Sequence, residues 1–230
     1  MSNKSRTIVL GTNIFEAVKK DGDSLREELK KNGTYLVNIM SSPGSGKTTT
    51  LISLINLLKD EFKIGVMEAD IDSDVDAIKV SEETGVKSIQ IHTDSLCYID
   101  VGMVRKGLSH FDQMDFDLIF IENIGNMVCP SSFDTGACLN VCILSVPEGD
   151  KKPYNYPMMF EGSDLVLLNK IDALPFFDYN IAEVEEFIKS VNPFASFLPY
   201  SAKTKEGLEE VADYLRKRIQ DWRNQHARDL

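Results

Sequence analysis

The segment of this chain best suited to chemistry is Ser42-Pro43-Gly44-Ser45-Gly46-Lys47-Thr48-Thr49, between the apolar run 35–40 and a helix-like run 50–58. The glycines let the backbone turn tightly and point its N–H groups at phosphate. Lys47 can reach the outer phosphates, and the Thr48 hydroxyl can ligate magnesium. The strict pattern has glycine where this chain has Ser41. We predict a loop that binds a nucleoside triphosphate; the alternative is a Gly/Ser turn between two elements.

A second candidate segment, Asn169-Lys170-Ile171-Asp172, follows the apolar run 165–168. The Asp172 carboxylate can accept paired hydrogen bonds from the N1–H and 2-amino groups of guanine, whereas adenine presents the wrong pattern. We expect Asn169 to tie this loop to the phosphate loop and the Lys170 stem to lie against the base. After the next apolar run come the further candidates Ser201, Ala202 and Lys203. The predicted nucleotide is therefore GTP, with GDP as the product; a helix-capping turn is the alternative for the tetrad alone.

Acidic residues gather between Glu68 and Asp76, where a second apolar run ends. Several carboxylates at one strand end repel each other and are tolerated best beside a cation. We expect Asp70 to lie on the magnesium side and Asp76 to orient water or close on the γ-phosphate. For Asp72 and Asp74 a solvated acidic loop is the favoured interpretation, and Asp74 or Asp76 could instead cap the following helix.

Glu122 and Gly125 have the spacing of the DxxG element of GTPases, with glutamate in place of aspartate. A strand ending here would point Glu122 toward the magnesium shell or the attacking water, through an intervening water. Gly125 would let its backbone approach the γ-phosphate, so hydrolysis could move this loop. With Lys47 and Asp76, these two residues form the predicted catalytic set.

Apolar, strand-like runs alternate with helix-like runs along the chain. The strand-like runs cover residues 35–40, 63–69, 88–92, 117–121, 141–146, 165–168 and 196–200. This alternation predicts an α/β fold in one domain of residues 1–230, with a mostly parallel sheet and helices on both faces. An amphipathic helix is expected over residues 11–33 and a closing helix over 206–224.

Composition limits the possible functions. A chain of 230 residues with 43% hydrophobic content can bury a sizeable core. The net charge of −11 argues against a general nucleic-acid binder. Four unevenly spaced cysteines suit a reducing compartment better than a disulfide framework, and no apolar stretch approaches the length of a membrane span. We expect a cytoplasmic protein that needs neither nucleic acid nor membrane.

Taken together, these motifs resemble the HypB family of hydrogenase nickel-incorporation GTPases over about residues 10–222. The segments that carry the resemblance are Ser41–Thr49, Glu122–Pro130, Phe133–Gly136, Ser145–Pro153, Tyr156–Phe160 and Asn169–Asp172. The resemblance implies a P-loop NTPase fold of the SIMIBI type, GTP-dependent homodimerisation and slow GTP hydrolysis coupled to nickel insertion into a metalloenzyme. It also implies two further partners, a nickel-delivery accessory protein and the target enzyme.

The family's metal site, at the dimer interface, corresponds here to Cys97, Tyr98 and Cys129. Tyr98 replaces a histidine, and a protonated phenol is a poor ligand for a borderline divalent ion. Two cysteines per subunit could still supply four thiolates for nickel or zinc across a symmetric dimer. The alternatives are a buried thiol and a structural loop residue, and His92 could compensate or be an ordinary surface or core histidine.

Two other classes of function remain open at this point. One is a GTP-dependent dimerisation switch or regulator that has lost metal transfer, which Tyr98 favours. The other is an accessory GTPase for a different metallocofactor enzyme, against which Cys129 counts. No arginine finger is evident; Arg105 could act across a dimer, but a solvated helix residue is the favoured interpretation. Cys142 is expected to be a small core residue.

Overall fold

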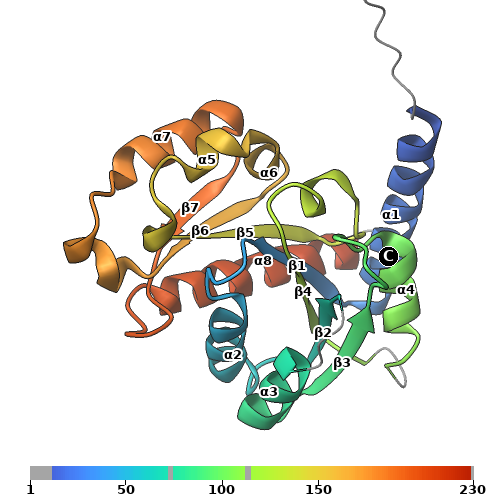
Figure 1. The fold of residues 1–230 in the computed structure, drawn as a ribbon. Coiled ribbons are helices and arrows are strands. Elements are labelled where there is room, and N and C mark those ends of the chain that lie inside the picture. The colour runs from blue at the N-terminus through green and yellow to red at the C-terminus, as the bar shows by residue number, and fades with distance from the viewer. Residues whose placement is uncertain (1–11, 72–74, 112–114, 229–230) are drawn as a thin grey trace, which may run out of the picture.

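Seven parallel strands form the sheet at the centre of the computed structural model, which describes residues 12–71, 75–111 and 115–228 (Figure 1). The strand order is β3-β2-β4-β1-β5-β6-β7, and every neighbouring pair is parallel. The strands are β1 Tyr35–Ser41, β2 Ile64–Asp70, β3 Lys87–His92, β4 Leu118–Gly125, β5 Leu139–Ser145, β6 Leu165–Asn169 and β7 Ser196–Pro199. The predicted α/β sheet is confirmed.

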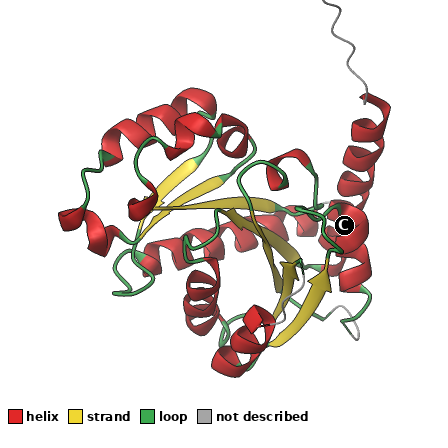
Figure 2. Cartoon of the chain, viewed as in Figure 1, coloured by secondary structure: helices red, strands yellow, loops and turns green. Residues whose placement is uncertain are grey.

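Helices cover both faces of this sheet (Figure 2). The α-helices are α1 Thr12–Asn32, α2 Lys47–Leu58, α3 Val75–Thr84, α4 Val101–Leu108, α5 Lys152–Asn155, α6 Pro157–Glu161, α7 Ile181–Val191 and α8 Leu208–Arg228. Short 3-10 helices are η1 Pro130–Ser132, η2 Val146–Glu148 and η3 Ile171–Phe176. No helix in the described ranges has the length and apolar character needed to cross a membrane.

The core divides into three clusters, because the sheet buries apolar side chains on both faces. On one face α2 and α8 pack against alternate residues of the central strands, including Val37 and Ile39. On the other face α1 and α4 pack over the β2–β4–β1 side, and α6 and α7 pack over the β5–β6–β7 side. The segment between these two groups of helices, residues 126–137, therefore crosses the sheet face near β1 and β5 (Figure 1).

Strand β4 differs most from its predicted bounds, because it continues to Gly125 rather than ending at Ile121. Its polar extension is paired: Glu122 lies opposite Glu68 of β2, and Asn123 Nδ2 donates to Asn38 Oδ1 over 3.0 Å. Apolar patterning stops at Ile121, so sequence periodicity could not reveal these cross-strand partners.

Candidate functional site

The phosphate loop turns through two glycines in the left-handed region, Gly44 at φ 76° and Gly46 at φ 99°. A Cβ atom at Gly46 would lie 2.5 Å from Asn169 Nδ2, so a side chain is excluded there by both backbone angle and space. The next residue, Lys47, begins α2. The strand, turn and helix are thus arranged as the sequence predicts, with the helix N-terminus at the loop where backbone N–H groups can meet phosphate.

Ser41, the residue that departs from the glycine of the strict pattern, is fully buried and is a hydrogen-bonding centre. Its Oγ accepts from Lys47 Nζ over 3.1 Å and from Ser45 Oγ over 2.5 Å, and donates to the Ser42 carbonyl over 2.7 Å. The substitution therefore supports the loop from within.

Two buried carboxyl groups lie beside the start of α2. Thr48 Oγ1 donates to Glu122 Oε1 over 2.8 Å, and Glu68 is opposite Glu122 on the neighbouring strand. Glu68 Oε1 and Glu122 Oε2 are buried, with no hydrogen-bond partner among the residues the structure describes. Burial raises the pKa of Glu122 to about 7, although the nearby positive charge of Lys47 acts to lower it. Burial and the facing Glu122 carboxyl raise the pKa of Glu68 well above its ordinary value.

Glu68 and Glu122 both line a cavity of about 50 Å³. It is lined by the predicted residues Lys47, Asp70, Asp76, Glu122 and Gly125, and by Glu68, Ala69, Gln90 and Asn123. Asp70, Glu122 and the neighbouring Thr48 carry the carboxylate and hydroxyl oxygens that magnesium prefers. In the described residues they do not yet converge as a group of three acidic ligands. We predicted no individual role for Glu68. In the sequence it is recognisable only as the first residue of the acidic segment and as a charged residue inside an apolar strand.

The acidic segment after β2 reaches this cavity in part. Asp70 ends β2 and is half-buried, while Asp76 is exposed in the first turn of α3, where its charge complements the helix dipole. Both residues line the cavity, and their roles toward magnesium and the γ-phosphate stay predictions. Asp72 and Asp74 fall outside the described residues.

The guanine-type loop is joined to the phosphate loop by direct hydrogen bonds. Asn169 Nδ2 donates to the Ser45 carbonyl over 2.9 Å, and Lys170 Nζ donates to the Gly44 carbonyl over 2.6 Å. Asn169 Oδ1 also accepts from the backbone N–H of Ala202 over 3.0 Å. One buried amide thus connects three loops at the carboxyl end of the sheet, as the sequence predicts for Asn169.

Asp172 lies at the start of η3 with its side chain 22% exposed. Its Oδ1 accepts from Ser201 Oγ over 2.7 Å, and its Oδ2 is 3.8 Å from Lys203 Nζ. Two residues of the loop after β7, Ser201 and Lys203, therefore hold the Asp172 carboxylate, which follows β6.

Gly125 brings the end of β4 against the phosphate loop. A Cβ atom at Gly125 would lie 3.1–3.2 Å from three atoms of Pro43, so the close approach favours glycine. Residues 126–129 continue directly from this contact to the candidate metal cysteine. The chain thus links the predicted γ-phosphate sensor to Cys129 over four residues.

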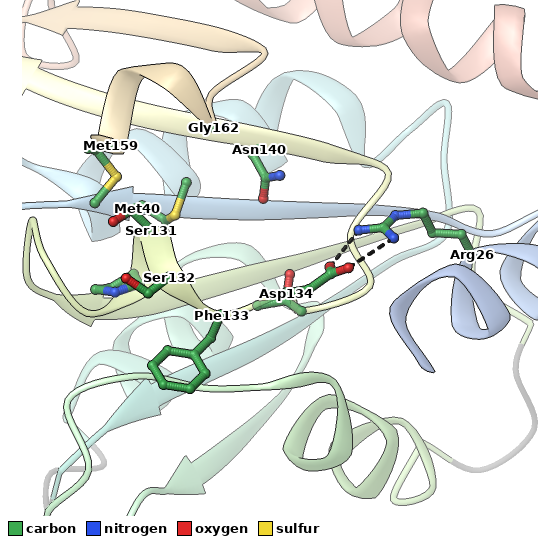
Figure 3. Close-up of a pocket in the computed structure, with 11 residues that line it drawn as sticks. Arg26, Met40, Ser131, Ser132, Phe133, Asp134, Asn140, Met159 and Gly162 are labelled. Atoms are coloured by element: carbon green, nitrogen blue, oxygen red, sulfur yellow. Dashed lines mark hydrogen bonds and ion pairs between the residues drawn. The ribbon is translucent and has the colours of Figure 1, made fainter. Parts of the chain in front are cut away.

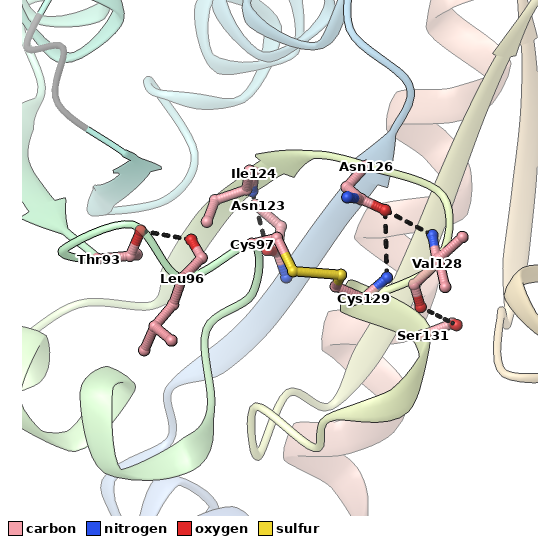
Figure 4. Close-up of a disulfide and its surroundings, with 9 residues drawn as sticks. All are labelled: Thr93, Leu96, Cys97, Asn123, Ile124, Asn126, Val128, Cys129 and Ser131. Carbon is pink, nitrogen blue, oxygen red and sulfur yellow. Dashed lines mark hydrogen bonds between the residues drawn. A yellow bond between two sulfur atoms is a disulfide. The ribbon is translucent and has the colours of Figure 1, made fainter.

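Cys97 and Cys129 are joined in a disulfide within the chain, with Cα atoms 5.9 Å apart (Figure 4). The sequence predicted free thiols here, supplied as metal ligands. The difference arises because the loops after β3 and β4 converge, although their cysteines are 32 residues apart. Across the described residues, no group of three or more His, Cys, Asp or Glu side chains could hold a metal ion.

Tyr98 stacks on Phe133 with ring centroids 3.5 Å apart and planes 3° from parallel. Beside Phe133, Asp134 forms a bidentate ion pair with Arg26 of α1, with N–O distances of 3.1 and 2.5 Å. This pair borders a pocket of about 330 Å³ that Met40 and Asn140 also line (Figure 3). The pocket was not predicted, since its wall comes from separate parts of the chain.

The remaining candidates are His92, Arg105 and Cys142, and His92 lies opposite Asp70 of β2 in the sheet. His92 is exposed at the end of β3 and belongs to no metal-binding group among the described side chains. Arg105 binds Asp21 and Glu28 of α1 in the same chain. Cys142 is fully buried in the core, as predicted.

Comparisons with known proteins agree with this geometry. Residues 35–199 match the family model described as CobW/HypB/UreG, nucleotide-binding domain. The chain is 37% identical to the hydrogenase/urease maturation factor HypB of Helicobacter hepaticus over 226 residues, 96% of this chain and 92% of that protein.

Two solved structures are similar throughout. One is HypB from Helicobacter pylori in complex with nickel, with TM-score 0.83, 35% identity and coverage of 89% of this chain and 96% of that one. The other is the hydrogenase maturation factor HypB from Archaeoglobus fulgidus, with TM-score 0.81, 35% identity and coverage of 89% and 99%.

Proposed function

The chain belongs to the CobW/HypB/UreG family, and within it to the HypB maturation factors, and from this premise we propose that it is a GTPase metallochaperone that delivers nickel during hydrogenase maturation. It hydrolyses GTP slowly to GDP and phosphate. The observation that carries the nucleotide half is the Asn169 amide, which donates to the Ser45 carbonyl over 2.9 Å and so joins the guanine-type loop to the phosphate loop.

In this proposal the chain's own residues position the nucleotide. The loop 42–49 surrounds the phosphates with backbone N–H groups. The Lys47 amine gives up its hydrogen bond to Ser41 Oγ and binds the outer phosphates instead. Asp172 accepts from the guanine edge, with Ser201 and Lys203 holding its carboxylate. The pairing of a fixed base loop with a fixed phosphate loop favours GTP over other nucleoside triphosphates.

Magnesium, when bound, neutralises charge that develops on the phosphates. Thr48, Asp70 and Glu122 would hold it, and the orphaned Glu122 Oε2 is the observation that supports this assignment. Asp76 is placed to orient water, and Gly125 to sense the γ-phosphate through its backbone.

The metal half of the proposal treats nickel, or zinc, as cargo held by Cys97 and Cys129 in their reduced form. A GTP-dependent homodimer would bring together four thiolates, a set that suits either ion. The partners are a nickel-delivery accessory protein and the target metalloenzyme. We place the protein in the cytoplasm, where the reducing environment would keep Cys97 and Cys129 as thiols.

The nucleotide assignment is tested with Asp172→Asn, which exchanges the acceptor for an amide. We expect affinity for GTP to fall by at least about 100-fold and xanthosine triphosphate to bind in its place, because two charge-assisted hydrogen bonds are lost. Asp178→Asn, at an exposed position of the same segment, is the matched control. An unchanged preference for GTP in Asp172→Asn would refute the guanine assignment.

The metal assignment is tested by titrating the reduced protein with nickel and with zinc, with and without a GTP analogue, while dimer mass is measured. Cys97→Ala and Cys129→Ala should each remove the bound ion, whereas Cys138→Ala should not. If both of the first two variants bind as the parent does, these thiolates are not the site.

A further inference from the structure

The loop after β3 and the loop after β4 meet through two separate side-chain contacts. The disulfide joins Cys97 to Cys129 (Figure 4). One residue further along the first loop, the ring of Tyr98 lies on the ring of Phe133. The loops come from β3–α4 and β4–η1, which are separated in the sheet by β2. Their meeting is therefore made by these side chains and not by strand pairing.

Each loop is also fixed by its own hydrogen bonds. Asn126 Oδ1 accepts from the backbone N–H groups of Val128 and Cys129 over 2.7 and 3.2 Å. In the other loop, Thr93 Oγ1 donates to the Leu96 carbonyl over 2.7 Å, and the Leu96 N–H donates to the Thr93 carbonyl over 3.1 Å. Breaking the sulfur–sulfur bond leaves all these bonds intact, so the two sulfur atoms stay facing each other.

The segment after Cys129 is held from two sides. Phe133 is stacked on Tyr98, and the adjacent Asp134 is ion-paired with Arg26 of α1. The stack therefore keeps Cys129 beside Cys97 whether or not the sulfurs are bonded. This contact gives Tyr98 a structural task beside Cys97.

The two bonded cysteines lie beside exposed side chains. Cys97 and Cys129 are half-buried, and their neighbours Leu96 and Val128 are exposed at 39% and 59%. Cys138 and Cys142 differ, because burial raises the pKa of both thiols, to about 11 for Cys138. Exchange with a small thiol or disulfide is thus directed to the Cys97–Cys129 pair.

We propose that Cys97 and Cys129 form a reversible dithiol–disulfide switch that closes the metal site when oxidised and opens it when reduced, with the Tyr98–Phe133 stack holding the pair together in both states. The switch rests on the proposed function, in which these thiolates hold nickel. A disulfide offers no thiolate, whereas the dithiol binds Ni²⁺ and releases two protons.

The redox step balances with a low-molecular-weight disulfide such as oxidised glutathione. One protein thiolate attacks that disulfide and expels one thiol, forming a mixed disulfide. The second protein thiolate then attacks the protein sulfur, expels the second thiol and closes Cys97–Cys129. The protein loses two electrons, which the small disulfide gains. An excess of reduced thiol reverses both steps.

The test uses the full chain equilibrated in glutathione buffers of graded ratio, without metal, then blocked and digested with trypsin. Oxidation should join the peptides 88–105 and 107–151, which trypsin otherwise separates at Arg105 and Lys106. Samples taken in parallel are desalted anaerobically and titrated with Ni²⁺ alone. Nickel occupancy should fall at least tenfold on oxidation and track the fraction of joined peptide.

Matched variants separate the stack from the sulfurs. Tyr98→Phe keeps the stacked ring and should leave the equilibrium constant for disulfide formation unchanged. Tyr98→Ala should lower that equilibrium constant about fivefold, because the aromatic contact is lost. Cys138→Ala should behave as the parent, and Cys97→Ala should bind nickel equally weakly in every buffer.

The outcomes distinguish the two proposals. If reduced and oxidised protein bind nickel equally, or if no buffer joins the two peptides, the switch is refuted while the metallochaperone function stands. If the fully reduced protein binds no nickel, the metal half of the proposed function fails and the switch fails with it. Equal disulfide constants for Tyr98→Ala and Tyr98→Phe would refute the role of the stack.

Discussion

Replacing Glu122 with glutamine is predicted to stabilise the protein at alkaline pH while it impairs the nucleotide site. Glu122 is 4% exposed and lies opposite Glu68, whose carboxyl is also buried. Glutamine has the same shape, can still accept from Thr48, and can donate to Glu68. The substitution therefore removes the cost of a buried negative charge without opening a cavity.

The magnitude follows from the pKa of Glu122. Burial raises it from 4.5 to about 7 in the folded chain. A raised pKa means that the folded chain binds the proton more tightly than the unfolded chain. The stabilising contribution is fully present below pH 4.5 and is lost as the pH rises through about 7. The difference between the two pKa values corresponds to about 3 kcal/mol of unfolding free energy.

The assay is urea denaturation of both proteins between pH 5 and 8, with a chelator present and no nucleotide. The quantity compared is the unfolding free energy of Glu122→Gln minus that of the parent, which should grow by about 2–3 kcal/mol across this range. Glu185→Gln, an exposed position on α7, should leave the corresponding difference flat. A flat difference for Glu122→Gln as well would refute the assignment of a buried, proton-binding carboxyl.

Three further outcomes are expected. Gly46→Ala should abolish GTP binding measured by calorimetry, because its φ of 99° and the 2.5 Å approach of Asn169 exclude a side chain; retained micromolar binding would contradict this. Arg26→Ala should cost about 1 kcal/mol in urea denaturation, since the half-exposed pair with Asp134 is partly screened; a change below the error would show that α1 docks by apolar contacts alone. In the reduced native protein, Cys138 should resist iodoacetamide at pH 8, because burial raises its pKa to about 11, and rapid labelling there would contradict that burial.

Local chemistry made the nucleotide loops predictable. The phosphate loop needs glycine at particular backbone angles directly before a helix, and Gly44 and Gly46 adopt them. The guanine-type tetrad needs an amide and a carboxylate three residues apart at a strand end, as Asn169 and Asp172 are. The five inner strands could also be located, because strands buried on both faces are continuous apolar runs. The predicted bounds were wrong where polar residues continue a strand, as they do in β4.

The residues that could bind GTP can be found without a structure, because they lie within short segments whose spacing sets their geometry. Which distant segments meet depends on the fold. It placed Glu68 opposite Glu122, stacked Tyr98 on Phe133 and joined Cys97 to Cys129. No local pattern encodes these contacts, since they depend on strand order and on how loops from different strands converge above the sheet.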